Sequence, residues 1–235
     1  MVATPRILAL VPCAGSGSRA GTVQPKQYQH VAGQPLVRHT LAALAATARV
    51  ARTVVVVAPG DATLRAPGAP WELADCGGAS RAESVFNGLA HLRATDGHDD
   101  DWVLVHDAAR CLVTSAQIDA LIDACLPDAV GGLLALPLPD TLKGEQDGRV
   151  TATIDRAHKW LAQTPQMFRL GALADALAPH AASGFAGITD EASAMEAAGH
   201  RPLLVRGSAQ NIKVTWPEDF ALAEAVLAAR GRMTK

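Results

Sequence analysis

Short, uninterrupted apolar runs recur along this sequence and limit the folds that are open to it. They cover residues 7–11, 53–58, 102–106, 131–136 and 202–205. Runs of this kind are typical of strands that are buried on both faces of a sheet, whereas half-exposed strands alternate apolar and polar residues. We therefore predict that these runs form the strands of a mostly parallel sheet.

Helical patterns fill the intervals between the apolar runs. In residues 36–46, Val37, Leu41 and Leu44 fall on one stripe of a helix, and Pro35 suits a helix start. Comparable patterns cover residues 83–93, a stretch from Thr114 or Ser115 to about residue 126, and residues 217–230. Strands that alternate with helices predict an α/β fold with helices on both faces of the sheet, and functional groups at the carboxyl ends of the strands.

Residues 137–160 do not fit this alternation. They mix Pro, Gly, Asp and Lys with a short β-like patch at residues 150–154. We predict that this segment leaves the sheet as a hairpin arm. Neither a repeat nor a linker is apparent in the sequence, so residues 1–235 are predicted to form a single domain.

Composition argues against membrane insertion and secretion. No apolar stretch reaches the roughly 18 residues of a membrane-spanning helix, and the first residues lack a secretory signal pattern. The four cysteines are widely spaced and include no Cys-x-x-Cys pair. This usage favours reduced thiols and a cytoplasmic location over a disulfide or zinc framework.

Charge is unevenly distributed along the chain. The first 60 residues contain six Lys or Arg residues and no Asp or Glu, although the whole chain has a formal net charge of -2. A cationic segment on an otherwise acidic chain favours a polyanionic partner, unless the distribution is accidental. Nucleic acid usually requires a denser basic face, so a compact anion such as a nucleoside triphosphate is the preferred interpretation.

A glycine-rich stretch, Ala14-Gly15-Ser16-Gly17-Ser18-Arg19-Ala20, directly follows the first predicted strand. Glycines let backbone N–H groups converge on phosphate oxygens. The stretch also satisfies the G-x-G-x-x-G/A pattern of dinucleotide-binding folds. That alternative is disfavoured because Gly21, Pro25 and Pro35 interrupt any following helix, and because no acid occurs before Asp61. A P-loop is not predicted, because no Gly-Lys-Ser/Thr follows.

Arg19 in this stretch and Lys26 after it can converge on one phosphate chain, although a solvated loop with two incidental cations is the alternative.

Together with Pro25-Lys26-Gln27-Tyr28, the stretch resembles the signature of the 2-C-methyl-D-erythritol 4-phosphate cytidylyltransferase family, which belongs to the nucleotidyltransferases. Further matching motifs are Val105-His106-Asp107-Ala108-Ala109-Arg110, Asp140-Thr141, Asp155-Arg156, Gln163-Thr164-Pro165-Gln166, Thr189-Asp190-Glu191-Ala192 and Asn211-Ile212-Lys213-Val214-Thr215. The resemblance extends over essentially the whole chain and implies a Rossmann-like sheet of the nucleotidyltransferase type.

The resemblance implies a reaction in which the acceptor's phosphate oxygen attacks the α-phosphorus of CTP and expels pyrophosphate. It implies that Arg19 and Lys26 stabilise the transition state, and that Arg156 and Lys213 orient the acceptor's phosphate. This agrees with electrostatics, since two anions can be brought together only where cations face both of them. His106 is interpreted as a structural residue at a strand end.

Further substrate-binding residues follow from the resemblance. They are Ala14, Gly15, Gly17, Gly78, Ser84, Asp107, Arg110, Thr141, Thr164 and Thr189. Ordinary structural roles stay open for several of them: a turn at Gly78, a cap at Asp107 or Thr189, and local pairing for Arg110. Mg²⁺ is the expected cofactor, and Asp107 is a candidate ligand for it.

The sequence departs from the family pattern at three positions, Ala79, Cys111 and Gln210, and no metal role is assigned to Ala79 or Gln210. In the family, the arm reaches a partner subunit, so the resemblance implies a homodimer with shared sites. Two alternatives remain open: a ribitol-5-phosphate cytidylyltransferase, and a non-catalytic nucleotide-binding regulator.

Overall fold

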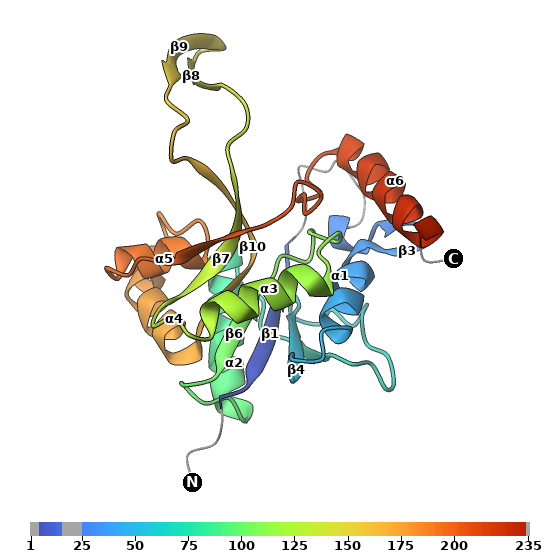
Figure 1. Ribbon diagram of the computed structural model, residues 1–235. Coiled ribbons are helices and arrows are strands. Elements are labelled where there is room, and N and C mark those ends of the chain that lie inside the picture. Colours follow the sequence, from blue (N-terminus) through green and yellow to red (C-terminus); the bar gives the residue numbers. More distant parts are fainter. Residues whose placement is uncertain (1–4, 16–24, 234–235) are drawn as a thin grey trace.

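A seven-stranded sheet forms the centre of the protein (Figure 1). The computed structural model describes residues 5–15 and 25–233. The strand order is β11-β7-β10-β6-β1-β4-β5. The bounds are β1 Ile7–Pro12, β4 Arg52–Val56, β5 Glu72–Ala74, β6 Trp102–Val105, β7 Gly131–Pro137, β10 Trp160–Arg169 and β11 Leu203–Arg206.

The sheet is mostly parallel, as predicted. β1 pairs in parallel with β4 and β6, β4 with β5, and β7 with β11, whereas β10 is antiparallel to both of its neighbours, β6 and β7. All five predicted strands are present, with bounds that shift by one or two residues. β4 ends at Val56, and the next residue, Val57, accepts at its carbonyl from the Gly77 amide over 2.8 Å. β5 and β10 were not predicted, because neither is an uninterrupted apolar run.

Helices cover both faces of the sheet, which confirms the α/β prediction (Figure 1). Along β1, Leu8 and Leu10 face one hydrophobic core, and Ala9 and Val11 face the other, as the alternation of side chains in a strand requires. The first core includes residues of α2, α4 and α5, and the second includes residues of α1 and α3. The bounds are α1 Leu36–Ala45, α2 Arg81–Thr95, α3 Ser115–Cys125, α4 Leu170–Leu177, α5 Glu191–Ala197 and α6 Pro217–Met233.

Side-chain caps mark the starts of α2, α3 and α5. Thr114 and Gln117 form a capping box at the start of α3. α2 begins two residues before the predicted start, because the Ser80 hydroxyl accepts from the Glu83 amide and satisfies one of the free N–H groups of the first turn. None of the helices in the described ranges is both long and apolar enough to cross a membrane.

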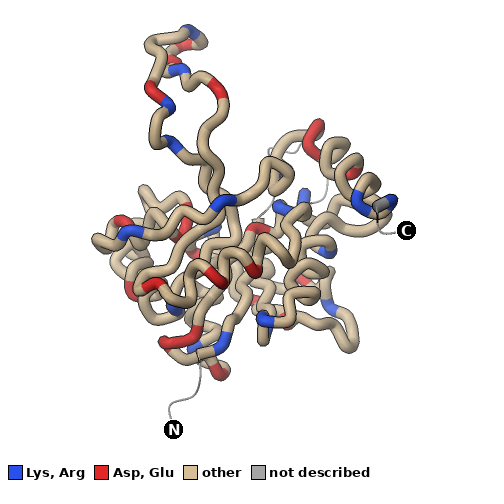
Figure 2. Tube along the Cα trace, in the orientation of Figure 1, with Lys and Arg blue, Asp and Glu red and all other residues tan. Residues whose placement is uncertain are grey.

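The predicted arm is a hairpin that projects from the sheet (Figure 1). It consists of β8, Leu142–Gln146, and β9, Arg149–Ile154, which pair antiparallel. Every residue of β9 is exposed, including Val150, whose exposed fraction is 66%. Figure 2 shows both signs of charge along the arm. The remaining short elements are the 3-10 helices η2 Lys26–Tyr28 and η3 Ala178–Ser183, and the strands β2 His30–Val31 and β3 Gln34–Pro35.

Candidate active site

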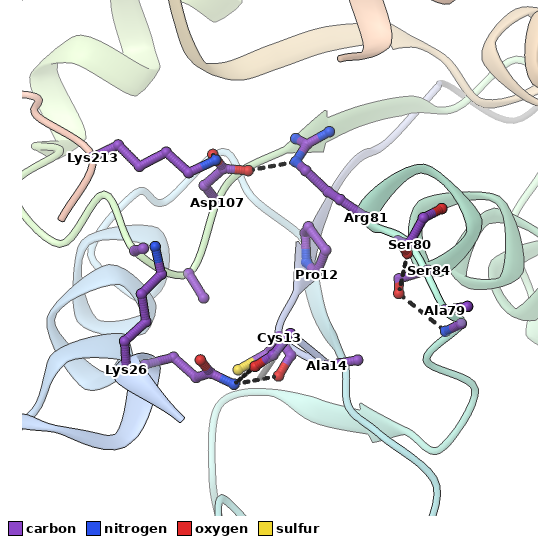
Figure 3. Close-up of a pocket in the computed structure, with 15 residues that line it drawn as sticks. Pro12, Cys13, Ala14, Lys26, Ala79, Ser80, Arg81, Ser84, Asp107 and Lys213 are labelled. Carbon is purple, nitrogen blue, oxygen red and sulfur yellow. Dashed lines mark hydrogen bonds and ion pairs between the residues drawn. The ribbon is translucent and has the colours of Figure 1, made fainter. Parts of the chain in front are cut away.

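Two adjoining pockets lie beyond the carboxyl ends of β1 and β6, where the fold class predicts a site. The first has a volume of about 250 Å³ and the second about 240 Å³. Three residues line both pockets and form the boundary between them: Arg81, Asp107 and Lys213. Figure 3 shows these three side chains at one end of the first pocket and the segment 12–14 at the other.

The loop that follows β1 is held in place by the segment that carries Lys26. The buried Gln27 side chain donates from Nε2 to the carbonyl of Cys13, at 3.0 Å, and to the carbonyl of Gly15, at 2.8 Å. The next residue, Tyr28, donates to Asp61 Oδ2 over 2.6 Å. The two bonds from Gln27 fix Cys13 and Gly15, at the described start of the glycine-rich stretch, relative to the neighbouring Lys26, which also lines the first pocket.

Two lysines from distant parts of the chain meet in the first pocket. Lys26 Nζ donates to the carbonyl of Val214 over 2.8 Å, which brings it beside Lys213. Lys213 Nζ lies 2.6 Å from Asp107 Oδ2. Both side chains extend into the same space (Figure 3), so an anion in this pocket meets two cations.

Asp107 is held as a carboxylate between two cations. Its Oδ1 accepts from Arg81 Nε over 2.7 Å, and its Oδ2 from Lys213. Burial alone would raise the pKa of the Asp107 carboxyl, but the charges of Arg81 and Lys213 outweigh it and hold that pKa well below its usual range. Asp107 is therefore charged throughout the neutral range, and its low pKa makes it a weak general base.

Behind Asp107, a buried hydrogen-bond chain fixes its backbone. The Asp107 amide donates to Thr164 Oγ1, and this hydroxyl lies 3.0 Å from His106 Nδ1. His106 Nε2 lies 3.2 Å from the carbonyl of Arg110, so the neutral ring donates there and accepts from Thr164. Complete burial lowers the pKa of His106 to about 4, so the ring is neutral near pH 7. The structural interpretation of His106 fits this arrangement.

A second loop, at residues 76–80, closes the other side of the first pocket. The Gly78 amide donates to Ser84 Oγ over 3.0 Å, and Ser84 Oγ donates to the Ser80 carbonyl over 2.9 Å. A Cβ at Gly77 would collide with the Ala14 side chain and with the Val57 carbonyl. Glycine is required here because the two loops that line the pocket approach each other closely.

Comparison with known proteins identifies the family of this chain. The sequence model of the 2-C-methyl-D-erythritol 4-phosphate cytidylyltransferase family matches residues 7–229. The chain is similar to the enzyme of that name from Ralstonia nicotianae, with 54% identity over 95% of this chain and 92% of the relative. The chain belongs to this cytidylyltransferase family.

Two further comparisons agree with this assignment. The bifunctional enzyme IspD/IspF of Albidiferax ferrireducens is 63% identical over 97% of this chain, and the chain spans 54% of the length of that relative. A crystal structure of 4-diphosphocytidyl-2C-methyl-D-erythritol synthase superposes with a TM-score of 0.85 at 38% identity, covering 96% of this chain and all of that one. The likeness to this cytidylyltransferase therefore includes the arrangement of the chain as well as the motifs.

Most of the predicted site residues lie around the two pockets of this cytidylyltransferase. Those lining the first are Ala14, Gly15, Lys26, Gly78, Ser84, Asp107 and Lys213; Arg110, Thr164 and Thr189 join Asp107 and Lys213 in the second. Arg110 donates to the backbone carbonyls of Asn211 and Ala162, at 2.7 and 3.3 Å, and burial lowers the pKa of its guanidinium. Arg110 therefore binds backbone carbonyls of the same chain and also lines the second pocket, so both roles considered for it stay open.

Four predicted site residues are not among the residues that line these pockets. Gly17 and Arg19 fall outside the described residues. Thr141 and Arg156 lie exposed on the arm, and Arg156 donates to the carbonyl of Pro139. The described part of one chain therefore does not bring Arg156 and Thr141 to the pockets.

Sequence reasoning missed two charged residues, Arg81 and Glu191. Arg81 lies in the first turn of α2 and binds both Asp107 and Glu191. Glu191 is buried, with an exposed fraction of 2%, at the start of α5. Glu191 belongs to the motif Thr189-Asp190-Glu191-Ala192, whereas Arg81 lies in none of the matching motifs. Arg81 is more than 25 residues from Asp107 along the chain, and Glu191 more than 80, so only the fold brings the three together.

The three departures from the family pattern lie in different surroundings. Cys111 is buried in a small core with Leu112 and Val214. Ala79 lines the first pocket, where its amide donates to Glu83 Oε2 over 2.7 Å. Gln210 Oε1 accepts from Arg230 of α6 over 2.8 Å. Among the described residues, no group of three or more His, Cys, Asp or Glu side chains is arranged to hold a metal ion.

Proposed function

We infer that this protein transfers CMP from CTP to 2-C-methyl-D-erythritol 4-phosphate and releases pyrophosphate, for the synthesis of isoprenoid precursors. A phosphate oxygen of the acceptor forms a bond to the α-phosphorus of CTP, and the bond from that phosphorus to the β-phosphate oxygen breaks. The pair of joined pockets at the sheet edge supports this proposal most directly. One pocket has the glycine-rich loop for a nucleotide, the other can hold a polyol phosphate, and Lys213 lines both.

Fixed positive charge is the main catalytic device in this proposal. Both substrates are anions, and their charge at the reacting phosphorus grows along the reaction path. Lys26 faces the triphosphate, and Lys213 orients the acceptor's phosphate from the wall shared by the two pockets. Cations that are already in position stabilise the transition state without reorganisation at the moment of reaction. Arg19 is proposed to act with Lys26 on the triphosphate.

Asp107 is proposed to hold these cations rather than to move a proton. A phosphate monoester is already anionic near neutral pH, so the nucleophile needs no strong base. The carboxylate binds Lys213 on one oxygen and Arg81 on the other. It also lines the second pocket, where the acceptor's hydroxyl groups are its proposed contacts.

Mg²⁺ is proposed to enter with the triphosphate. Asp107 is the only carboxylate among the described residues that line the first pocket, and both of its oxygens already accept from cations. Mg²⁺ commonly takes most of its ligands from substrate phosphates and water. When bound, it would neutralise part of the phosphate charge. The protein residues therefore need to supply few ligands of their own.

A homodimer completes the site in this proposal. The arm projects away from the body (Figure 1), and Thr141 and Arg156 are exposed, so an arm of this kind can present them to a second copy. Exposed apolar side chains on the arm, such as Val150 and Ile154, support this role, since such surfaces often mark protein interfaces. The enzyme is further proposed to work in the cytoplasm, where its four free cysteines stay reduced.

The test is a matrix of nucleotides and acceptors with Mg²⁺, in which released pyrophosphate is measured. CTP with 2-C-methyl-D-erythritol 4-phosphate is expected to give the highest kcat/KM. A higher kcat/KM with ribitol 5-phosphate would identify that compound as the acceptor, and the proposed transfer of CMP from CTP would stay the same. If calorimetry showed CTP binding but no nucleotide and acceptor pair released pyrophosphate, the protein would be assigned as a nucleotide-binding regulator instead of an enzyme.

A further inference from the structure

One buried acid beside the pockets has no place in the mechanism above. Glu191 lines neither pocket and is almost completely buried, with an exposed fraction of 2%. Its two carboxylate oxygens accept from the two terminal nitrogens of Arg81, at 2.6 and 3.0 Å. A buried charge of this kind is costly unless it is paired, so its contact with Arg81 needs a reason.

The contact fixes the orientation of the Arg81 guanidinium. A fork of two parallel hydrogen bonds sets both the plane and the direction of this planar group. With its terminal nitrogens on Glu191, the guanidinium points its third nitrogen, Nε, at Asp107 Oδ1 over 2.7 Å. All three guanidinium nitrogens of Arg81 therefore bind carboxylates: two bind Glu191 on one side, and the third binds Asp107 on the other.

Charge then alternates along a single row from Glu191 to Lys213. The acids Glu191 and Asp107 are each next to Arg81, and Asp107 is also next to Lys213. Figure 3 shows the Arg81, Asp107 and Lys213 part of this row. If Glu191 lost its charge, Arg81 would have Asp107 as its one carboxylate in this row. Arg81 and Lys213 would then compete for the same two oxygens.

The first turn of α5 holds Glu191 firmly at the start of this row. Gln166 of β10 accepts from the Ala192 amide over 2.7 Å and donates to Asp190 Oδ2 over 2.8 Å. Glu191 lies between these two anchored residues. Through Gln166, β10 is therefore connected to the start of α5, and from there the ion pairs of the row lead to the pockets.

We propose that Glu191 is a positioning residue for the transfer reaction, which acts through Arg81 to fix Asp107 and, with it, the Lys213 ammonium between the two pockets. This role rests on the proposed function, since it concerns the same pockets. A shift of about 1 Å in a group that positions substrate can cost about 100-fold in rate.

The first experiment compares Glu191→Gln with a matched control, Glu72→Gln, in steady-state pyrophosphate release. Glu72 also accepts two hydrogen bonds from one arginine: Arg52 Nε and Nη2 donate to its two carboxylate oxygens, each over 2.7 Å. This pair lies on the edge of the sheet away from the pockets. Glu191→Gln is expected to lower kcat about 10- to 100-fold, with the KM for CTP changed less than about threefold. Glu72→Gln is expected to keep the wild-type kcat. A kcat for Glu191→Gln within about twofold of this control would overturn the proposal.

The second experiment separates positioning from a general loss of structure. In an Arg81→Met background, Glu191→Gln is expected to cause no further fall in kcat/KM, because the group through which it acts is gone. A structural defect would instead lower kcat/KM by the same factor in both backgrounds, and that result would overturn the proposal. The folded fraction of each variant is measured by thermal unfolding.

Conservative variants keep the proposal testable if Glu191→Gln does not fold. Glu191→Asp retains the charge with a shorter reach, and Arg81→Lys retains the charge without the fork. Both are expected to fold and to lose kcat, with Glu191→Asp the more active; wild-type kcat in both would overturn the proposal. Pyrophosphate release by the wild type distinguishes failure of the proposed function from failure of the positioning role of Glu191. If the wild type releases none, both are rejected. If the wild type releases pyrophosphate and the variants are unaffected, the positioning role alone is rejected.

Discussion

The backbone amide of Asp107 and the hydroxyl of Thr164 are joined across two antiparallel strands by a hydrogen bond of 3.0 Å. The same hydroxyl lies 3.0 Å from His106 Nδ1, so one small side chain satisfies two buried polar groups at once. Thr164 also lines the second pocket. The position of Asp107, and hence of the cations that it binds, depends on this contact.

Thr164→Val is therefore expected to reduce both stability and turnover. Valine has nearly the same shape but leaves the Asp107 amide and the His106 ring nitrogen without a partner, at about 1–3 kcal/mol for each unsatisfied buried group. Urea unfolding measures the loss. Thr47→Val is the control, because the buried Thr47 hydroxyl donates only to the carbonyl of Ala43 in its own helix segment. Equal losses in the two variants would contradict the prediction.

Lys26→Met is expected to lower kcat about 100-fold or more, because it removes the preorganised cation that is proposed to face the triphosphate. The methionine side chain keeps the packing of the lysine stem. Arg49→Met removes a cation that forms surface ion pairs with Asp119 and Asp123, and it is expected to leave kcat unchanged. Pyrophosphate release measures both variants, and normal turnover by Lys26→Met would refute the assigned role.

Acid is expected to destabilise the fold through His106. The pKa of this ring is lowered by burial from 6.5 to about 4, so the unfolded chain binds the proton more tightly than the folded chain. The contribution of His106 is fully present above about pH 6.5 and falls as the pH drops toward 4, by about 2 kcal/mol at pH 5. Urea unfolding at pH 7.5 and 5 measures it.

His106→Gln is the comparison for this pH effect, because glutamine can replace the donor and the acceptor but does not titrate. Its free energy of unfolding is expected to fall less between pH 7.5 and 5 than that of the wild type. An equal fall in both proteins would assign the acid sensitivity to other groups.

Shared sites predict that two inactive variants restore each other. Lys26→Met disables the pocket of its own chain, and Arg156→Ala disables the arm that reaches the partner. In a mixed dimer, one of the two sites combines an intact pocket with an intact arm. After unfolding and refolding together in equal amounts, the variants are expected to recover about a quarter of the wild-type activity. No recovery, or an active monomer by light scattering, would contradict the shared site.

Removal of divalent cations is expected to abolish turnover without affecting the fold. Among the described residues, no group of three or more His, Cys, Asp or Glu side chains is arranged to hold a metal ion, and Mg²⁺ is proposed to enter with the triphosphate. EDTA should stop pyrophosphate release, and excess Mg²⁺ should restore it, while the Tm of the protein without CTP stays constant. A fall in Tm with EDTA would reveal a resident structural metal instead.

Parts of the architecture could be predicted because they depend on local pattern. The valine run that ends at Val57, the apolar stripe of Val37, Leu41 and Leu44, and the cap at Thr114 each specify an element through nearby residues. β10 could not be predicted in this way. Its first residues lie exposed at the base of the arm and its later ones are buried between β6 and β7, so no single period describes it.

The sequence by itself determined the sheet, its covering helices, the projecting arm and the glycine-rich loop, because apolar periodicity and turn chemistry act over a few residues. Only the tertiary structure decided which charges meet. Arg81, Asp107, Glu191 and Lys213 come from four separate segments, and Lys26 reaches the carbonyl of Val214 across 188 positions of the chain. Electrostatic interaction falls with distance in space rather than in sequence, so the charge arrangement of this site exists only once the chain has folded.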